Sequence, residues 1–585
     1  MLKILKRFTL KDRLFAFFIM ILIITQVYFD LKLLDYSANL ATIASSGDLS
    51  LERVLTNGGF MMLCALVSLV CAILTGFCSS KISANIARTL RKDVFNKVQS
   101  FSLNEINYFS HASLITRTTN DIVQIQMMFA MGLAVLVKAP VLAIWSIARM
   151  SSGAWQWTLS SSIIIAIVII TIIIIIGVCI PKFKKVQTLT DKLNDITKEN
   201  LSGIRVIRAY NANDYQEQKF DKANKNMADN YLAINRRLAF LQPTMTLAMS
   251  SITLVIYWIG AYLMKTTPSN EQAILIGSMQ AFTQYVIQVV MAFMMIIIIS
   301  SMIPRTLVCV RRVNEVFDTS VIIKDGEFSQ DTEIKGKVEF RNVSFSYEKG
   351  EEEVIQNISF IANKGETVAI IGATGSGKTT LVNLIPRFYD VTSGEVLVDD
   401  INVKDYKQET LHQKIGYVSQ TAVLFKGDIE SNLNLGDNNA TKEDIDLALE
   451  ISQSLDFVNK LDKKEKAFVA QLGSNFSGGQ KQRLNIARAL ARKPEIVIFD
   501  DSFSALDFKT DKNLRLSLKE KLKDTTTIIV AQRIGTIINA DKIIVLEDGK
   551  IAGIGNHHQL LNDCDAYYQI ALSQLSKEEI ENEKE

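Results

Sequence analysis

The sequence lacks any pair of cysteines at the spacing of a metal site or a redox motif. Its 585 residues include six cysteines, and no two of them form a CxxC pair. Five of the six lie in or beside long apolar runs, where a cysteine packs as a small hydrophobic residue. The cysteines therefore predict neither a disulfide framework nor a metal centre. They are Cys64, Cys71, Cys78, Cys179, Cys309 and Cys564.

The sequence also lacks an excess of either charge. Its 64 lysines and arginines are nearly balanced by 61 aspartates and glutamates, for a formal net charge of +3. Because no strong basic field would attract phosphate backbones, nucleic acid is not an expected partner. The basic N-terminus and the apolar run behind it lack a small-residue cleavage site. They predict an uncleaved membrane helix rather than a signal peptide.

Long apolar runs are abundant in the first 320 residues. Hydrophobic residues make up 48% of the chain, and a helix needs about 20 apolar residues to cross a bilayer. Six segments meet this requirement, so the first half is predicted to be a six-span membrane domain. The predicted spans are Leu14–Leu34, Gly58–Cys78, Met127–Arg149, Trp157–Ile180, Leu241–Met264 and Ile274–Ile303.

Lysine and arginine near the spans predict the orientation of the chain. They gather before the first span, in the connections 79–126 and 181–240, and after the sixth span, whereas the alternate connections have few. By the positive-inside rule, both termini are expected in the cytoplasm. The two long connections are amphipathic and have few helix breakers. We expect helices that extend beyond the bilayer and turn near Asn104–Ser113 and Tyr210–Tyr215.

Four polar residues are predicted at membrane depth. Lys138 lies midway along the third span, where a lysine faces a cavity or a partner, or extends its amine to the interface. Gln280, Gln284 and Gln288 recur every four residues and share one helix face. They are candidates for a substrate pathway, and the alternative is hydrogen bonding to a neighbouring helix.

After about residue 327 the pattern changes to short β-rich runs and amphipathic helices. The apolar run Val368–Ile371 leads directly into a complete phosphate-binding loop. In such a loop, backbone N–H groups surround phosphate oxygens, the lysine contacts the β- and γ-phosphates, and the following hydroxyl binds Mg²⁺. The loop residues are Gly372, Ala373, Thr374, Gly375, Ser376, Gly377, Lys378, Thr379 and Thr380.

A second acidic strand and a glycine-rich helix start follow downstream. Ile496–Asp500 is an apolar strand that ends in a carboxylate, the second element of a Mg²⁺–nucleotide site. Between it and the loop lie Ser477, Gly478, Gly479 and Gln480, small and polar residues that open a helix and could bind an anion.

With these motifs in this order, the whole chain resembles the exporter branch of the ABC transporters. The resemblance identifies Ser477–Gln480 as the signature motif, Tyr347 as the aromatic residue that stacks on adenine, and Gln420 as the glutamine loop, a further Mg²⁺ ligand beside Thr379 and Asp500. It also identifies a D-loop, comprising Ser504, Ala505, Leu506 and Asp507.

The resemblance implies an exporter-type α-helical membrane domain followed by an α/β nucleotide-binding domain that uses ATP and Mg²⁺. We expect the membrane domain at residues 1–320, a linker at 321–335, the nucleotide-binding domain at 336–575 and an acidic tail at 576–585. The two cytoplasmic turns would be coupling helices. In this family two domains pair head to tail, and each ATP lies between one phosphate loop and the other signature motif. A chain with one such domain therefore needs a second half-transporter.

Two positions depart from the family pattern. Asp501 follows the Mg²⁺-binding aspartate where the family usually has glutamate, and Gln532 stands where it usually has histidine. Aspartate is shorter by one methylene, and a positioning error of about 1 Å can cost roughly a hundredfold in rate. Glutamine cannot carry the positive charge of a histidine. The pattern resembles the degenerate-site subunit of bacterial heterodimeric multidrug exporters, and the alternative is a homodimer with slow hydrolysis.

The sequence therefore predicts a bacterial plasma-membrane exporter of small amphipathic compounds, such as drugs or lipids. A nucleotide-gated regulator that transports nothing remains a second hypothesis, and a peptide exporter a third. Only about 13 residues precede the first span, which argues against a built-in peptidase domain. An importer is not favoured, because importer permeases are commonly separate from their ATP-binding chains.

Overall fold

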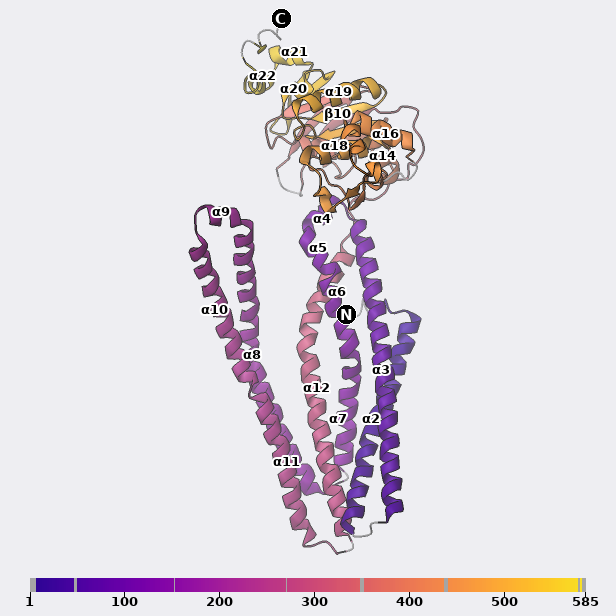
Figure 1. The fold of residues 1–585 in the computed structure, drawn as a ribbon, viewed down its shortest axis with the longest axis vertical. Coiled ribbons are helices and arrows are strands. Elements are labelled where there is room, and N and C mark those ends of the chain that lie inside the picture. The colour runs from indigo at the N-terminus through magenta and orange to yellow at the C-terminus, as the bar shows by residue number, and fades with distance from the viewer. Residues whose placement is uncertain are drawn as a thin grey trace. The chain divides into compact units, whose positions relative to one another are not determined.

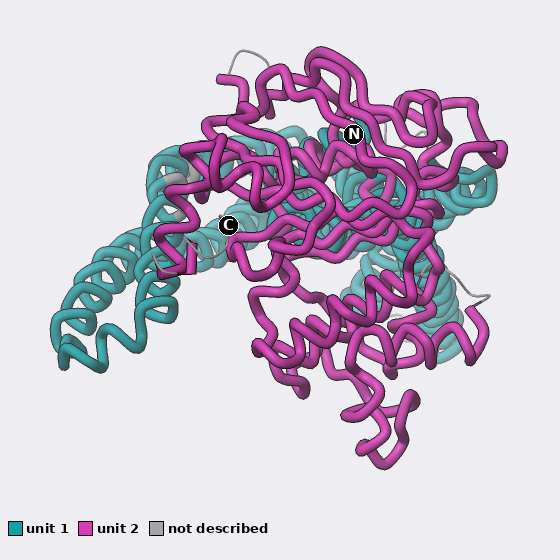
Figure 2. The backbone as a smooth tube through the Cα atoms, turned by 90° about the horizontal axis from the view of Figure 1, so that it is seen from above, with its two compact units in different colours: residues 1–97, 112–318 teal, residues 98–111, 319–585 magenta. Residues whose placement is uncertain are grey.

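The protein is described from a computed structural model that covers residues 7–46, 50–151, 153–269, 271–347, 352–435, 440–576 and 579–580. These form two compact units, shown in Figure 2: residues 1–97 with 112–318, and residues 98–111 with 319–585. The first six residues of the basic N-terminus and most of the acidic tail predicted at 576–585 lie outside the described residues.

The first unit contains six long apolar helical segments, as the sequence predicts (Figure 1). The longest uninterrupted helix of this unit among the described residues has 49 residues and would extend about 74 Å, more than twice the hydrocarbon thickness of about 30 Å. The segments are α2 (Leu10–Ser46), α3 (Leu51–Gln99), α5–α7 (His111–Thr118, Asn120–Met127 and Leu133–Met150, with a π-helical turn at Met128–Gly132), α8 (Trp155–Ser202), α10–α11 (Asn213–Leu238 and Leu241–Met264) and α12 (Gln272–Asp318).

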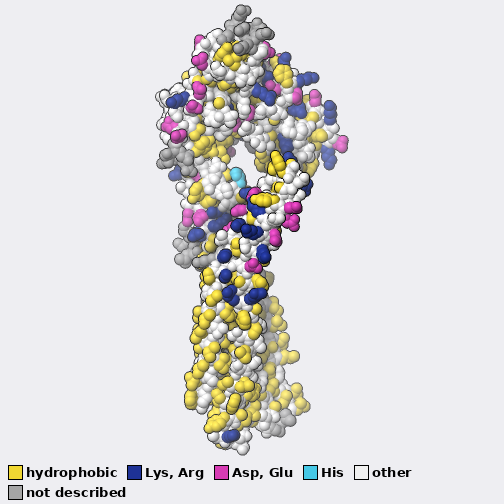
Figure 3. All heavy atoms as spheres, turned by 90° about the vertical axis from the view of Figure 1, so that its left-hand side faces the viewer, with side chains coloured by type: hydrophobic (Ala, Val, Ile, Leu, Met, Phe, Trp, Pro, Cys, Tyr) yellow, Lys and Arg dark blue, Asp and Glu magenta, His cyan; other side chains and the backbone are white. Residues whose placement is uncertain are grey.

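These helices have apolar residues on both their packed and their outer faces. On α2, Ile19 and Ile23 are buried against neighbours, whereas Phe17 and Ile21 are exposed. In the space-filling view of Figure 3, hydrophobic side chains cover one end of the helical unit, and charged ones gather toward its other end. An exposed apolar belt of this extent suits a lipid environment rather than water.

The second unit is built around a six-stranded sheet in the order β12-β11-β3-β10-β9-β6. Its strands run parallel except for β12. Because β3 is central and covered on both faces, Val368, Ala369 and Ile370 are fully buried, which explains the uninterrupted apolar run. The strands are β3 (Thr367–Gly372), β6 (Ile415–Val418), β9 (Ile496–Asp500), β10 (Thr526–Val530), β11 (Lys542–Glu547) and β12 (Lys550–Gly555).

An antiparallel sheet and several helices complete this unit. The sheet has the order β2-β1-β4-β5, formed by Ile355–Ala362, Val338–Phe345, Ser393–Val398 and Ile401–Asn402. A third sheet pairs β7 (Gly427–Asp428) with β8 (Phe468–Val469). The helices are α13 (Lys378–Asn383), α14 (Gln408–Lys414), α15 (Ile429–Leu433), α16 (Lys442–Ile451), α17 (Leu455–Asn459), α18 (Gly478–Leu490), α19 (Phe508–Lys521), α20 (Ile534–Ile537), α21 (His557–Asp563) and α22 (Asp565–Leu572), with 3₁₀ turns at Lys464–Lys466 and Gln471–Gly473.

The first of the two predicted turns, near Asn104–Ser113, folds with the second unit. It forms the short helix α4 (Leu103–Phe109), where Glu105 Oε1 accepts a hydrogen bond from the Ile322 backbone N–H at 2.9 Å. Asn107 Nδ2 lies 3.4 Å from the Tyr389 hydroxyl, and Leu103 packs on the core of the sheet. This turn thus contacts the α/β unit directly.

The second turn overlaps the predicted position, Tyr210–Tyr215, and begins before it. The helix α8 ends at Ser202 with Gly203 as its C-cap, the short helix α9 (Ile204–Ala209) follows, and Asn211 adopts a left-handed conformation with φ 49° before α10. Tyr210 is 80% exposed and Val206 61% exposed.

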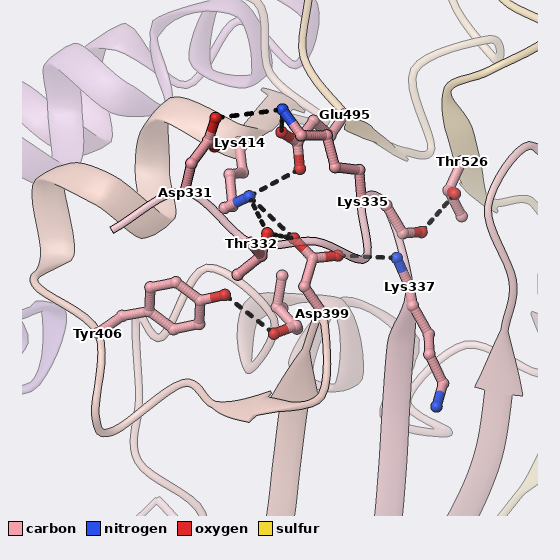
Figure 4. Close-up of polar contacts among 11 residues, drawn as sticks. Asp331, Thr332, Lys335, Lys337, Asp399, Tyr406, Lys414, Glu495 and Thr526 are labelled. Atoms are coloured by element: carbon pink, nitrogen blue, oxygen red, sulfur yellow. Dashed lines mark hydrogen bonds and ion pairs between the residues drawn. The ribbon is translucent and has the colours of Figure 1, made fainter. Parts of the chain in front are cut away.

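A buried polar cluster fixes the segment that leads into β1 (Figure 4). Lys414 Nζ donates to Asp399 Oδ2 and Glu495 Oε2, both at 2.9 Å, and to the Thr332 hydroxyl at 2.8 Å. Burial alone would lower the pKa of Lys414, but its hydrogen bonds to Glu495 and Asp399 outweigh this and raise the pKa. Stabilisation by this amine is therefore complete at neutral pH and declines only as the pH rises above the usual lysine range.

Replacing Lys414 with methionine should destabilise the α/β unit by about 3 kcal/mol, because the buried Asp399 loses its cation. The measurement is hydrogen exchange of the β4 and β6 amides in the full-length protein. Lys335→Met is the matched control, since Lys335 lies at the exposed edge of the same cluster, 3.7 Å from Glu495, and should cost under about 1 kcal/mol. Equal protection in both variants would contradict this account.

Candidate functional site

The phosphate-binding loop connects β3 to α13, and its glycines are required by the backbone. Gly375 and Gly377 have φ values of 89° and 92°, which side-chain-bearing residues rarely adopt. A Cβ on Gly372 would lie 2.2 Å from the Leu546 carbonyl oxygen. A residue with a side chain would therefore be strained at 375 and 377 and would clash at 372, so the loop requires glycine at these three positions.

Lys378 is buried in this loop. Its Nζ donates to the carbonyl oxygens of Gly372 at 2.9 Å and Ala373 at 2.7 Å. Burial lowers the pKa of Lys378, and the nearby carboxylates of Asp501 and Asp500 partly oppose this. An anion bound in the loop would stabilise the charged amine further.

Thr379 and Asp500 meet at the carboxyl edge of the sheet. The Thr379 hydroxyl donates to Asp500 Oδ1 at 2.8 Å, and the Tyr417 hydroxyl donates to Asp500 Oδ2 at 3.3 Å. Burial raises the pKa of Asp500, while these hydrogen bonds and Lys378 lower it. A divalent cation beside this carboxylate would favour its ionised form.

Asp501 is held between two side-chain amides. Its Oδ2 accepts hydrogen bonds from Gln532 Nε2 at 2.8 Å and from Gln420 Nε2 at 3.2 Å. The three residues follow β9, β10 and β6, which are neighbours in the sheet. Asp501 also has a left-handed backbone with φ 47°. The two positions that depart from the family pattern are therefore in direct contact.

Sequence reasoning missed two residues at this site. The Gln574 side chain accepts from the Ile534 backbone N–H and donates to the Gln532 carbonyl oxygen, both at 2.8 Å, so it holds the loop after β10. Tyr417, which holds Asp500, lies on β6 beside β9. Neither residue belongs to a local motif, because both contacts arise from packing between distant segments.

Tyr347 lies next to the helix that follows the loop. Its hydroxyl is 2.8 Å from the Thr380 hydroxyl, and its ring packs edge-on against Tyr389 and Phe345. The side chain is partly exposed, so the ring remains accessible to a planar ligand.

The glycine-rich segment Ser477–Gln480 opens α18. Ser477 is its N-cap and forms a capping box with Gln480, in which each side chain bonds the other residue's backbone N–H. The space around Gly478 is open: a Cβ there would meet no atom within 4 Å, whereas one on Gly479 would lie 3.4 Å from the Ala505 carbonyl oxygen. Within the described part of the chain, no hydrogen bond joins this segment to the phosphate loop.

The residues Ser504–Asp507 connect Asp501 to α19. The Ser504 hydroxyl donates to the Asp501 carbonyl oxygen at 2.9 Å, and Asp507 caps α19 by accepting from the Thr510 N–H at 3.0 Å. That backbone hydrogen bond lowers the pKa of Asp507. Leu506 is buried in the core of the unit.

In the membrane unit, Lys138 pairs with an acidic residue that sequence reasoning missed. Its Nζ lies 3.6 Å from Asp30 Oδ2, and Ser68 donates to the same carboxylate. The sequence contains a signal for this residue, because Asp30 lies inside the first predicted span, where an acidic side chain usually needs a partner. Of the three glutamines, Gln280 donates to the Ser37 hydroxyl at 3.1 Å, while Gln284 and Gln288 are half-buried.

The residues of the α/β unit fit a Mg²⁺–nucleotide. The Ser376 hydroxyl is buried without a hydrogen-bond partner in the described residues, next to the open glycine loop. The described residues contain no group of three or more His, Cys, Asp or Glu side chains able to hold a metal alone. A cation here would therefore depend on Thr379, Asp500 and Gln420 together with phosphate oxygens.

Comparison with known proteins agrees with this arrangement. A family model described as "ABC transporter" matches residues 355–504, and one described as "ABC transporter transmembrane region" matches residues 14–301. An uncharacterized ABC transporter ATP-binding protein of Mycobacterium tuberculosis is 37% identical over 516 residues, which cover 87% of each chain.

A relative named for its activity and a solved structure extend the comparison. The ATP-dependent lipid A-core flippase of Haemophilus influenzae is 29% identical over 529 residues, 89% of each chain. A solved bacterial Atm1-family ABC exporter with ATP bound superposes with a TM-score of 0.78 at 22% identity, over 97% of this chain and 98% of that one. The latter similarity concerns the fold.

Proposed function

The chain belongs to the ABC transporter family, as an exporter-type half-transporter of the bacterial plasma membrane, and we propose that it is the degenerate-site subunit of a heterodimeric exporter. The observation that carries this proposal is the contact of Asp501 with Gln532 and Gln420. We assign residues 1–320 to the membrane domain, 321–335 to the linker and 336–575 to the nucleotide-binding domain, with both termini in the cytoplasm.

In the proposed mechanism the phosphate loop holds ATP. The backbone N–H groups of Gly372–Thr380 and the Lys378 amine bind the phosphates, and the Tyr347 ring stacks on the adenine. Mg²⁺, when bound, neutralises phosphate charge at the Thr379 hydroxyl, Asp500 and Gln420. Tyr417 holds the Asp500 carboxylate in position.

This site would bind ATP but hydrolyse it poorly. Asp501 is one methylene shorter than glutamate, and its Oδ2 is engaged by two amides. Both amides donate to the carboxylate, and neither can take up a proton or supply a positive charge. The Gln574 side chain holds the Gln532 backbone in place. The Gln532 and Gln420 amides therefore position the Asp501 carboxylate, and they are not suited to help it activate water.

The partner's site would be completed by this chain's signature motif. Ser477–Gln480 present an open helix N-terminus whose first glycine has no neighbour within 4 Å of an added Cβ, a surface suited to another chain's phosphates. Val206 of α9 and the following Tyr210 are exposed, so both side chains would be available to a partner. A homodimer would leave both sites with Asp501 and Gln532.

The transported compounds are proposed to be small and amphipathic. The exposed apolar belt places the membrane unit in lipid, and one relative is named as a lipid A-core flippase. Switching between inward and outward conformations, driven by ATP-dependent closure of the two nucleotide-binding domains, would carry the substrate outward.

The experiment is ATP hydrolysis by the complex purified from its native membrane and reconstituted in lipid, with and without candidate amphiphiles. Stimulation of turnover by an amphiphile supports export. A complex that hydrolyses ATP at one rate whatever amphiphile is added would favour the nucleotide-gated regulator and contradict the transport proposal.

A further inference from the structure

The membrane unit contains a polar cavity of about 390 Å³ that none of the predicted pathway residues lines. It lies among α2, α7, α8 and α12 near the ends that carry the short loops. Arg149 is one residue from the end of α7, and Ile274 is two residues after the start of α12. The volume is within the range of about 300–1,000 Å³ typical of small-molecule sites.

The helices that form the walls of this cavity pack closely against one another. A Cβ on Gly277 of α12 would lie 2.1 Å from the Thr42 hydroxyl and 2.6 Å from the Ala38 carbonyl oxygen of α2, so the two backbones approach closely there. Trp157 packs against Phe282 with ring centroids 5.6 Å apart. Apart from Gly153, in the connection between α7 and α8, the lining residues lie on helices.

Three charged side chains line the cavity, and together they carry one excess positive charge. The cations are Lys32 and Arg149, and the anion is Asp35. Arg149 lies 3.3 Å from the Asp35 carboxylate, which also accepts a hydrogen bond from the Tyr285 hydroxyl. The one carboxylate is therefore already satisfied by partners of its own.

Lys32 is less well satisfied. Its Nζ is 3.8 Å from Asp35 Oδ2, too far for a hydrogen bond, and lies 5.5 Å from the Tyr36 ring centroid. Within the described residues its ammonium has no hydrogen-bond acceptor. The indole N–H of Trp157, also at the wall, is buried without an acceptor there. Lys32 would gain from an anionic oxygen in the cavity.

The rest of the lining is mixed. Ile274, Ala281, Phe282 and the Trp157 ring form an apolar part, whereas Asn39, Thr42 and Ser278 are polar. A ligand that satisfies the cavity has an anionic group for Lys32 and Arg149 and a hydrocarbon or ring portion for the apolar part.

We propose that this cavity binds the anionic head of an amphiphile, a phosphate, carboxylate or sulfate joined to an apolar tail, during export. The inference rests on the proposed function for its placement at the outer side of the membrane, and it names the substrate class of the same transporter. The Asp30–Lys138 pair, which joins the same helices α2 and α7, is electrically balanced and so does not offset the positive charge of this cavity.

The test uses the complex in nanodiscs of zwitterionic lipid, without ATP, and a benzophenone-tailed dodecyl phosphate as a photoreactive probe. Labelled residues are mapped by mass spectrometry, and a benzophenone-tailed dodecyl maltoside is the neutral counterpart. In Lys32→Gln the concentration for half-maximal labelling by the phosphate probe should rise about tenfold, whereas labelling by the neutral probe should not change.

The matched control is Lys265→Gln, which removes a lysine at the end of α11 that does not line the cavity. It should leave phosphate labelling unchanged. An equal loss of phosphate-probe labelling in both variants would mean that the probe is attracted to surface lysines in general. No loss in Lys32→Gln would mean that the cavity does not select for an anionic head. Either result overturns the inference. Displacement of the probe by millimolar inorganic phosphate would overturn it too, because the site would then bind a free anion.

The inference and the proposed function can fail separately. Labelling without ATP does not depend on hydrolysis or on the partner's identity, so failure to stimulate turnover would leave the labelling result unaffected. Equal melting temperatures of Lys32→Gln and the wild type would show that a loss of labelling is not a loss of fold.

Discussion

Replacing Asp501 with glutamate and Gln532 with histidine together should raise hydrolysis at this chain's nucleotide site about a hundredfold. The glutamate restores the missing reach of about 1.5 Å, and a misplacement of about 1 Å can cost roughly a hundredfold in rate. The histidine restores a group that can be positively charged near the transferred phosphate. Because Gln532 Nε2 donates to Asp501 Oδ2, the two replaced side chains are in contact. The double variant should therefore hydrolyse ATP faster than either single variant.

Turnover should be measured in the assembled complex after the partner's catalytic carboxylate has been replaced by its amide, so that the remaining activity comes from this site. Asp501→Gln with Gln532→His is the matched control, since it has the length of glutamate without an ionisable carboxylate and should remain slow. If the glutamate–histidine variant hydrolyses ATP no faster than the wild type, these two residues are not the limiting defect.

Replacing Gly478 with aspartate should abolish nearly all hydrolysis by the complex, a loss of about a hundredfold or more. In an isolated chain this change is mild, because an added Cβ meets no atom within 4 Å and the backbone is not left-handed. In the complex the new carboxylate would face the partner's phosphates, and like charges in contact cost several kcal/mol, more than the roughly 2.7 kcal/mol that corresponds to a hundredfold.

Gly478→Asn separates charge from size, since it has nearly the same volume without the charge, and it should retain more activity than the aspartate variant. Lys378→Met in the phosphate loop is a second comparison. It should abolish ATP binding at this chain's own site but reduce turnover far less. A complex that tolerates Gly478→Asp yet fails with Lys378→Met would reverse the assignment of the two sites.

Local patterns were sufficient to predict the six spans, the phosphate loop and the acidic strand. A membrane helix must be largely apolar, and the covered part of a strand must be apolar on both faces, as at Val368–Ile371 of β3 and Ile496–Phe499 of β9. The glycines at 375 and 377 are required by positive φ at those positions. Each of these features depends on neighbours in sequence, so the sequence displays it directly.

Other contacts depend on topology and could not be predicted. Tyr417 reaches Asp500 because β6 pairs with β9, and Gln574 reaches the loop after β10 from beyond α22. The Asp30–Lys138 pair joins two helices separated by more than a hundred residues. No spacing rule links such positions.

The second of the two long connections shows the limit of a local pattern. The sequence predicts a turn near Tyr210–Tyr215, and Tyr210–Ala212 do separate α9 from α10, but α8 already ends at Ser202. The amphipathic pattern continues through α9, so periodicity alone could not reveal the earlier break. Glycine at the end of α8 and the left-handed Asn211 are the local causes.

Purification of this chain from its native membrane through a tag, with identification of what accompanies it, tests the central claim most directly. The account predicts a second half-transporter in a near 1:1 ratio, with glutamate and histidine at the positions equivalent to Asp501 and Gln532. Recovery of a self-paired dimer alone would contradict the degenerate-site assignment, because both sites would then have to function with the Asp501–Gln532 pair.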